Sequence, residues 1–224
     1  MTIINLMQEN IIMIVGISIL SFVSGMLGLG VAFAAIPFLG LFMQDLVHQV
    51  QPLSLLLNGI TALLSAFGFA KSGFVDWRKA ISIAVITTVF APVGALVVQF
   101  ISQKIVWIIY FVAVFYLAYR LSKPIKGLQK TENFKLAAIL AVPISILSGF
   151  LGVGPGFLLM PTLILLGFEP KKAAGINAFA VCPPSFSALI PHLTTAYWNF
   201  SLTVALVVVG AVIAENTLTL FTCV

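Results

Sequence analysis

The chain has 224 residues, of which 61% are hydrophobic and 8% are charged, and its formal net charge is +5 at pH 7. A soluble domain carries about 25% charged residues, so this composition excludes a soluble globular protein and predicts that the lipid bilayer is the main solvent. Backbone that crosses a bilayer must form helices or a closed barrel. The apolar segments are long and lack two-residue alternation, which predicts an all-α, polytopic integral membrane protein.

Apolar segments follow one another along the chain. Three are long enough to cross a bilayer alone, since one crossing takes about 20 residues; they are 52–70, 80–102 and 201–221. Two more helices are expected at 105–121 and 173–190. Four shorter segments flank two glycine-rich stretches; they are 11–24, 31–43, 136–148 and 157–168. We expect these four to be half-helices, too short to span without tilt or bilayer thinning.

Basic residues predict the orientation of the chain. The segments 71–79 and 122–135 are rich in Lys and Arg, whereas 44–51 has neither. Because Lys and Arg collect on the cytoplasmic side, we expect the two basic segments inside and 44–51 outside. Lys171 and Lys172 should also lie inside. That placement requires residues 136–168 to enter and leave on the same side, as a broken hairpin.

An internal repeat underlies the functional prediction. The segment 24–39 recurs at 148–163, and three glycines, one proline and one phenylalanine are among the identical positions. The expected loop sides place equivalent loops on opposite faces of the membrane, so we predict two inverted repeats with glycine-broken helices. The predicted division is residues 1–121 as the first repeat, 122–135 as a basic cytoplasmic linker, and 136–224 as a second repeat that lacks its last helix.

The glycines of the two breaks are the main candidate site residues; they are Gly25, Gly28, Gly30, Gly149, Gly152, Gly154 and Gly156. A half-helix that begins after such a break offers unpaired N–H groups and about half a positive charge. Glycine also lets an anion approach the backbone closely. Two such termini in one place would bind a small anion without a buried Lys or Arg. The alternative is that the glycines only allow close helix packing.

Polar side chains within two apolar segments are the other candidates. Asn58 belongs to a stripe at helical spacing that also holds Ser54, Thr61 and Ser65. Asn177 and Ser185 lie eight residues apart in the corresponding helix, which Pro183 and Pro184 are expected to interrupt. We expect such polar faces to meet protein or a water-filled path rather than lipid. Asn58 and Asn177 are therefore candidate substrate ligands, with interhelical hydrogen bonding as the alternative.

Several function classes lack their sequence signatures. The chain has no GxxxxGK[ST] motif for nucleotide, no HExxH, and no GxSxG. The two cysteines have no metal-binding spacing. We therefore predict no enzyme activity, no catalytic residues, no metal and no cofactor. The positive charge suits anionic lipid headgroups, so the expected partners are the bilayer and a small anion, without nucleic acid, and a homo-oligomer is compatible with the sequence.

The repeated SG-x-LG-x-G-xx-F-xxx-P motif, the loop Gly73-Phe74-Val75-Asp76-Trp77-Arg78 and the segment 170–175 resemble the sulfite exporter TauE/SafE family of membrane transporters. The similarity covers roughly residues 11–215. It implies a secondary transporter in the bacterial plasma membrane for sulfite or another small sulfur oxyanion or organosulfonate. The chain departs from the family pattern at Val31-Ala32 and Pro155, where a third consecutive glycine is common, and at Glu215. A passive anion channel and a truncated, non-transporting membrane protein are the alternatives.

Overall fold

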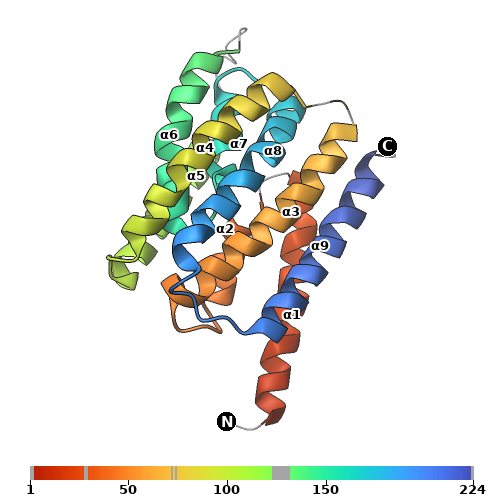
Figure 1. Ribbon diagram of the computed structural model, residues 1–224. Helices are drawn as coiled ribbons and strands as arrows, with labels where there is room; N and C mark the ends of the chain where they lie inside the picture. Colours follow the sequence, from red (N-terminus) through yellow and green to blue (C-terminus); the bar gives the residue numbers. More distant parts are fainter. Residues whose placement is uncertain (1–2, 28–29, 72, 74, 123–131, 223–224) are drawn as a thin grey trace.

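The computed structural model describes residues 3–27, 30–71, 73, 75–122 and 132–222, and the side chains of 8–24, 30–71, 73, 75–119 and 132–213. Over these ranges the chain forms nine α-helices and no strand (Figure 1). The helices are α1 (Ile3–Leu27), α2 (Ala32–Leu39), α3 (Gln51–Lys71), α4 (Trp77–Val98), α5 (Gln103–Ser122), α6 (Phe134–Leu151), α7 (Gly156–Leu165), α8 (Pro170–Leu189) and α9 (Phe200–Thr222). A π-helical turn, Leu46–Val50, precedes α3, and a 3-10 turn, Ile190–His192, follows α8.

Four stretches are long and apolar enough to cross a membrane: Leu46–Lys71, Trp77–Val98, Phe134–Leu151 and Pro170–His192. The predicted all-α membrane fold is confirmed. The predicted lengths of the hairpin helices are wrong, because α1 has 25 residues and α6 has 18. Helix α1 begins eight residues before its expected start, through a partly polar sequence, and both helices run three residues past their expected ends. Helix α6 stops only at Gly152, whose left-handed φ of 71° closes its last turn. Only α2 and α7, with 8 and 10 residues, are short.

Each long hairpin helix is followed by a short helix that runs back beside it. In the second hairpin, the Asn133 N–H donates to the Leu166 carbonyl at 3.1 Å, so α6 begins and α7 ends at the same end of the bundle. In the first hairpin, Glu9 of α1 and Met43, which follows α2, line one pocket. The two hairpins therefore open toward opposite ends of the molecule.

The ends of the bundle differ in charge. At one end Lys79 of α4 and Lys172 of α8 both pair with Glu132, which precedes α6. At the other end the Tyr197 N–H donates to the His48 carbonyl at 2.8 Å. The described parts of the two basic segments, 75–79 and 132–135, thus share one end, as predicted, and 44–51 lies at the other. Residues 123–131 of the predicted linker lie outside the described residues. The assignment of the basic end to the cytoplasm stays a prediction, as does the division into repeats.

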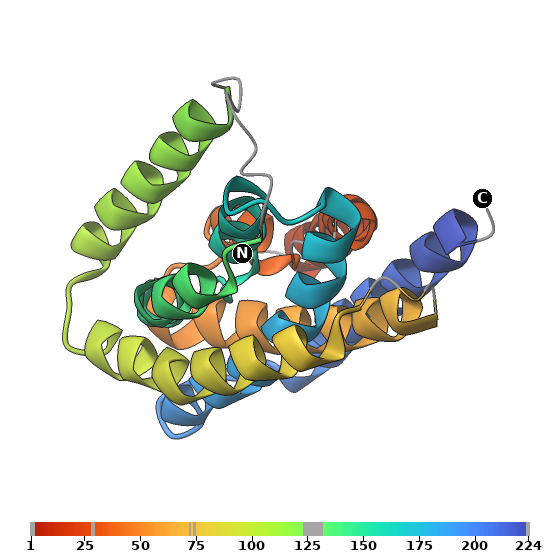
Figure 2. The same ribbon diagram turned by 90° about the horizontal axis from the view of Figure 1, so that it is seen from above.

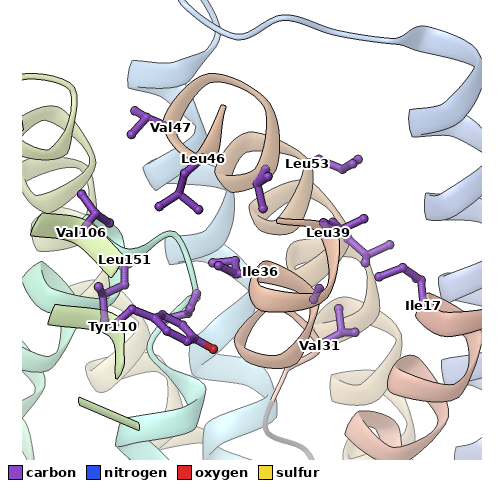
Figure 3. Close-up of a cluster of buried hydrophobic side chains, with 14 of the residues drawn as sticks. Ile17, Val31, Ile36, Leu39, Leu46, Val47, Leu53, Val106, Tyr110 and Leu151 are labelled. Carbon is purple, nitrogen blue, oxygen red and sulfur yellow. The ribbon is translucent and has the colours of Figure 1, made fainter. Parts of the chain in front are cut away.

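Helix packing crosses the boundary between the two sequence repeats. Helix α4 packs against α6 and α8 of the second half, and α9 packs against α1 and α3 of the first half. Helices α3 and α8 run side by side through the middle (Figure 1). The largest core joins α1, α2, α3 and α5 with the end of α6, as Ile17, Leu39, Leu53, Val106 and Leu151 show in Figure 3. Helix α5 stands apart from the other helices along much of its length (Figure 2).

Prolines inside the helices explain several interhelical hydrogen bonds. A proline removes the N–H that would bond the carbonyl four residues earlier. Pro37 leaves the Phe33 carbonyl without its helical donor, and this carbonyl accepts a hydrogen bond from the Tyr110 hydroxyl of α5. In the same way, Pro92 leaves the Thr88 carbonyl without its helical donor, and this carbonyl accepts a hydrogen bond from the Ser187 hydroxyl of α8 at 2.9 Å. The expected interruption of α8 is wrong: the helix continues through Pro183 and Pro184, and the Ala180 carbonyl accepts from Thr87 of α4 at 3.3 Å.

Candidate functional site

Asn58 lies at the middle of the 26-residue stretch Leu46–Lys71 and is fully buried. Its Oδ1 atom accepts a hydrogen bond from the Ala32 N–H at 3.2 Å, at the N-terminus of α2. Its Nδ2 atom donates to Ser185 Oγ of α8 at 2.9 Å. The Asn58 carboxamide on α3 therefore links the first glycine break to α8, which packs beside α3.

Both glycine breaks pack directly on Asn58. Gly30 and Gly154 have φ values of 86° and 69°, in the left-handed region that favours glycine. A β-carbon at Gly30 would lie 2.3 Å from Asn58 Oδ1, and one at Gly154 would lie 2.4 Å from Asn58 Nδ2. No other residue type fits at these two positions without moving Asn58. The two breaks therefore meet on either side of one buried carboxamide.

Two phenylalanines mark the same meeting point. Phe33 lies in the first turn of α2 and Phe157 in the first turn of α7, and the two occupy equivalent positions in the sequence repeat. Their rings stack with centroids 6.3 Å apart and an angle of 5° between the ring planes. The first turns of the two short helices thus face each other across the centre of the molecule.

Gln51 is a buried polar residue that the sequence analysis missed. Its Nε2 atom donates to the Phe150 carbonyl at the end of α6, at 3.1 Å. A β-carbon at Gly152, where φ is 71°, would lie 2.6 Å from Gln51 Cγ. The signal was present, because Gln51 precedes Ser54 by three residues and Asn58 by seven, which places all three on one helical face. All three are fully buried, so this face meets protein rather than lipid.

The remaining candidate residues lie in different surroundings. Gly149 packs against α4, where its β-carbon would lie 2.0 Å from the Ala91 carbonyl oxygen, so its role is close helix packing. Gly156 is the buried first residue of α7, and Gly25 belongs to the last turns of α1. Gly28 lies outside the described residues. Asn177 is buried on α8, but Ser185, two turns later, is the residue that bonds Asn58.

The centre of the site is neutral. Asn58, Ser185 and the backbone of the two breaks offer amide and hydroxyl groups, whereas Lys79 and Lys172 pair with Glu132 at the basic end of the bundle. There a hydrogen bond from Lys79 holds the pKa of the Glu132 carboxyl below its ordinary value. No three His, Cys, Asp or Glu side chains gather to hold a metal ion anywhere in the described part of the chain. The arrangement suits recognition of a small polar ion by neutral donors.

The model of the family described as "Sulfite exporter TauE/SafE" matches residues 12–218. The chain belongs to this family. It is therefore a membrane transporter protein and not an enzyme.

Two curated relatives carry the same broad description. A probable membrane transporter protein from Methanocaldococcus jannaschii is 28% identical over 196 residues, which cover 82% of this chain and 72% of the relative. The probable membrane transporter protein YunE from Bacillus subtilis is 26% identical over 215 residues, which cover 83% and 78%. No solved structure matches the chain.

Proposed function

We propose that this TauE/SafE transporter is a secondary transporter that moves a small sulfur oxyanion or organosulfonate, such as sulfite, across the bacterial plasma membrane. The observation that carries the proposal is the meeting of Gly30 and Gly154 on opposite sides of the Asn58 carboxamide, at mid-span. Sites built where broken helices meet near the midplane are typical of secondary transporters. The family description, sulfite exporter, supports a small sulfur oxyanion as the substrate.

Asn58 Oδ1 stands where a substrate oxygen would bind. It accepts from the Ala32 N–H at the first turn of α2, which is the position that a helix N-terminus offers to an anion. In the proposed mechanism a substrate oxygen replaces Asn58 Oδ1 at this N–H, and the freed carboxamide then donates to the anion. Binding without a buried Lys or Arg keeps the affinity moderate, so that the anion can also leave.

The buried centre favours alternating access over an open channel. Asn58 and Ser185 are both fully buried and bonded to each other, so solvent reaches neither of them in this conformation. Exposure of the site to each side in turn then requires movement of the helices around it. Transport should accordingly saturate with substrate and support exchange, whereas a channel would conduct without saturation.

Reconstituted vesicles test the proposal. Uptake of sulfite, sulfate, thiosulfate and sulfonates is measured in proteoliposomes, with and without a pH gradient. We expect saturable uptake of at least one of these anions, and we expect Asn58→Asp to abolish it because a carboxylate would repel the anion. Thr61→Ser, one turn further along α3, is the matched control and should transport normally. Wild-type flux in Asn58→Asp, or no uptake of any of these anions, would overturn the proposal.

A further inference from the structure

Two buried oxygen atoms on α3 have no hydrogen-bond partner within the described residues: Oε1 of Gln51 and Oγ of Ser54. Both residues have an exposed fraction of 0%. Buried polar atoms in native proteins nearly always have a partner. Two such atoms on the same helix face therefore indicate that something outside the polypeptide binds beside them.

Helix α6 fixes the position of the Gln51 carboxamide, and Ser54 lies beside Gln51 on α3. Residues three apart on a helix are neighbours, with β-carbons about 5–6 Å apart, so Gln51 and Ser54 form one polar surface. The Gln51 Nε2 atom is held by the Phe150 carbonyl at 3.1 Å, which anchors the carboxamide against the last turn of α6. Gly152 packs on the same side chain and closes α6 in the left-handed conformation.

The electrostatic character of this place is that of a cation site. The C-terminal end of a helix carries about half a negative charge, and Gln51 and Ser54 add neutral oxygen atoms. Hard cations select oxygen ligands, and in transporters the C-terminal ends of broken helices coordinate coupling cations. Neither α3 nor α6 contains an Asp or Glu, so the site lacks the negative charge that a divalent cation needs.

We propose that a monovalent cation, Na⁺, binds between α3 and the C-terminal end of α6, with Gln51 Oε1 and Ser54 Oγ among its ligands. Seven residues separate Gln51 from Asn58, which is about 10 Å along a helix. A cation at this distance attracts an anion bound at Asn58, so the two ions would enter and leave together. The cation site stands on its own observations, and only its coupling to the anion rests on the proposed function.

Direct binding of Na⁺ tests the site without any anion substrate. The full chain is purified in detergent, with choline chloride as the balancing salt, and ²²Na⁺ binding is measured by scintillation proximity. We expect saturable binding that Ser54→Ala and Gln51→Ala weaken at least tenfold. Thr61→Ala is the matched control, because the Thr61 hydroxyl bonds the Leu57 carbonyl of its own helix, and it should bind like the wild type.

Each result decides the question. If the wild type shows no saturable binding, the two oxygens hold an ordered water only and the inference falls. If Ser54→Ala elutes as a folded protein and binds like the wild type, the inference also falls. A second measurement compares anion flux in Na⁺ and in choline. Flux that is equal in both overturns the coupling and leaves the proposed function intact, whereas Na⁺ binding without flux of any sulfur anion keeps the cation site and overturns the proposed function.

Discussion

At the scale of single residues, the glycines of the breaks differ in what surrounds them. Gly154 and Gly73 have nearly the same positive φ, 69° and 73°. A β-carbon at Gly154 would lie 2.4 Å from Asn58 Nδ2, whereas one at Gly73 would meet nothing within 4 Å. Alanine at either position has a backbone strain of about 1–2 kcal/mol, but only alanine at Gly154 would also displace Asn58. Comparison of the two variants therefore distinguishes the effect of strain from the effect of displacing Asn58.

We predict that Gly154→Ala lowers anion uptake in proteoliposomes at least tenfold, while Gly73→Ala transports at nearly the wild-type rate. Both variants carry a strained residue, but only the first pushes the Asn58 carboxamide from its place between the breaks. Expression and membrane insertion, followed by fluorescence-detected gel filtration, should be similar for the two. Equal transport by both variants would show that the packing around Asn58 is irrelevant to function.

Tyr110 tests the hydrogen bonds that prolines make necessary. Its hydroxyl donates to the Phe33 carbonyl, which Pro37 deprives of its helical partner. We predict that Tyr110→Phe destabilises the protein by about 1–3 kcal/mol, the usual cost of an unsatisfied buried acceptor. Thermal unfolding in detergent measures the loss. Tyr116→Phe is the control, because Tyr116 is 64% exposed on the same helix, and an equal loss there would argue against this explanation.

Single residues were only partly predictable. The repeat and the helical spacing predict Gly30, Gly154 and Asn58 as site residues, and the structure brings these three together. Ser185 as the partner of Asn58 could not be chosen over Asn177, since both lie on one face of α8. The choice depends on how α3 and α8 are placed against each other, and the periodicity of one helix carries no information about that.

At the scale of helices, the boundaries were harder to predict than the path of the chain. Charge patterns predicted that the second hairpin enters and leaves at one end of the bundle, and Lys172 does pair with Glu132, which precedes α6. Both α1 and α6 run three residues past their expected ends, because the first glycine of each break, Gly25 and Gly149, remains helical, and α1 also begins eight residues before its expected start. Glycine inside an apolar helix is tolerated in a membrane where neighbouring helices pack on it.

The ion cluster at the basic end joins three helices that are distant in the sequence. Glu132 accepts from Lys172 at 3.0 Å and also pairs with Lys79, which in turn pairs with Asp76 at 3.1 Å. Hydrogen bonding from Lys79 lowers the pKa of Glu132 from its ordinary 4.5. A carboxyl whose pKa is lowered by folding stabilises the native state above its unfolded pKa, and this contribution is lost as the pH falls through the folded value.

We predict that Glu132→Gln lowers the unfolding temperature at pH 7 by a small amount, because partly exposed ion pairs contribute about 0.2–1 kcal/mol each. The difference from the wild type should shrink as the pH falls below about 4 and the wild-type carboxyl takes up its proton. Differential scanning fluorimetry in detergent across this pH range measures both. A difference that persists unchanged in acid would show that Glu132 acts through packing rather than charge.

At the scale of the whole molecule, the packing suggests how such a transporter could move. Helix α4 lies with the second hairpin and α9 with the first, so each body of packed helices contains parts of both sequence halves. Helices α3 and α8 form the contact between these bodies and carry Asn58 and Ser185. In the alternating-access mechanism that we propose, a shift along this contact would separate the two side chains and expose the breaks. Sequence alone could not reveal that α4 packs with the second hairpin and α9 with the first, because the sequence repeat divides the chain into two consecutive halves.

The arrangement of the two hairpins makes a prediction about topology. Gln44, which follows the first hairpin, and Glu169, which follows the second, are both exposed and lie at opposite ends of the bundle. In a background with Cys182 and Cys223 replaced by alanine, we expect Gln44→Cys to react with a membrane-impermeant maleimide added to whole cells. Glu169→Cys should react only after permeabilisation, since the positive-inside rule places its basic neighbours in the cytoplasm.

Lys71→Cys is the matched control for this labelling, because Lys71 is exposed at the end of α3, far from the start of that helix. It should behave like Glu169→Cys and unlike Gln44→Cys. Labelling of Gln44→Cys and Glu169→Cys from the same side would place both hairpins in one leaflet. Their short helices could then not approach Asn58 from opposite directions across the membrane, and a shared anion site at mid-span would be ruled out.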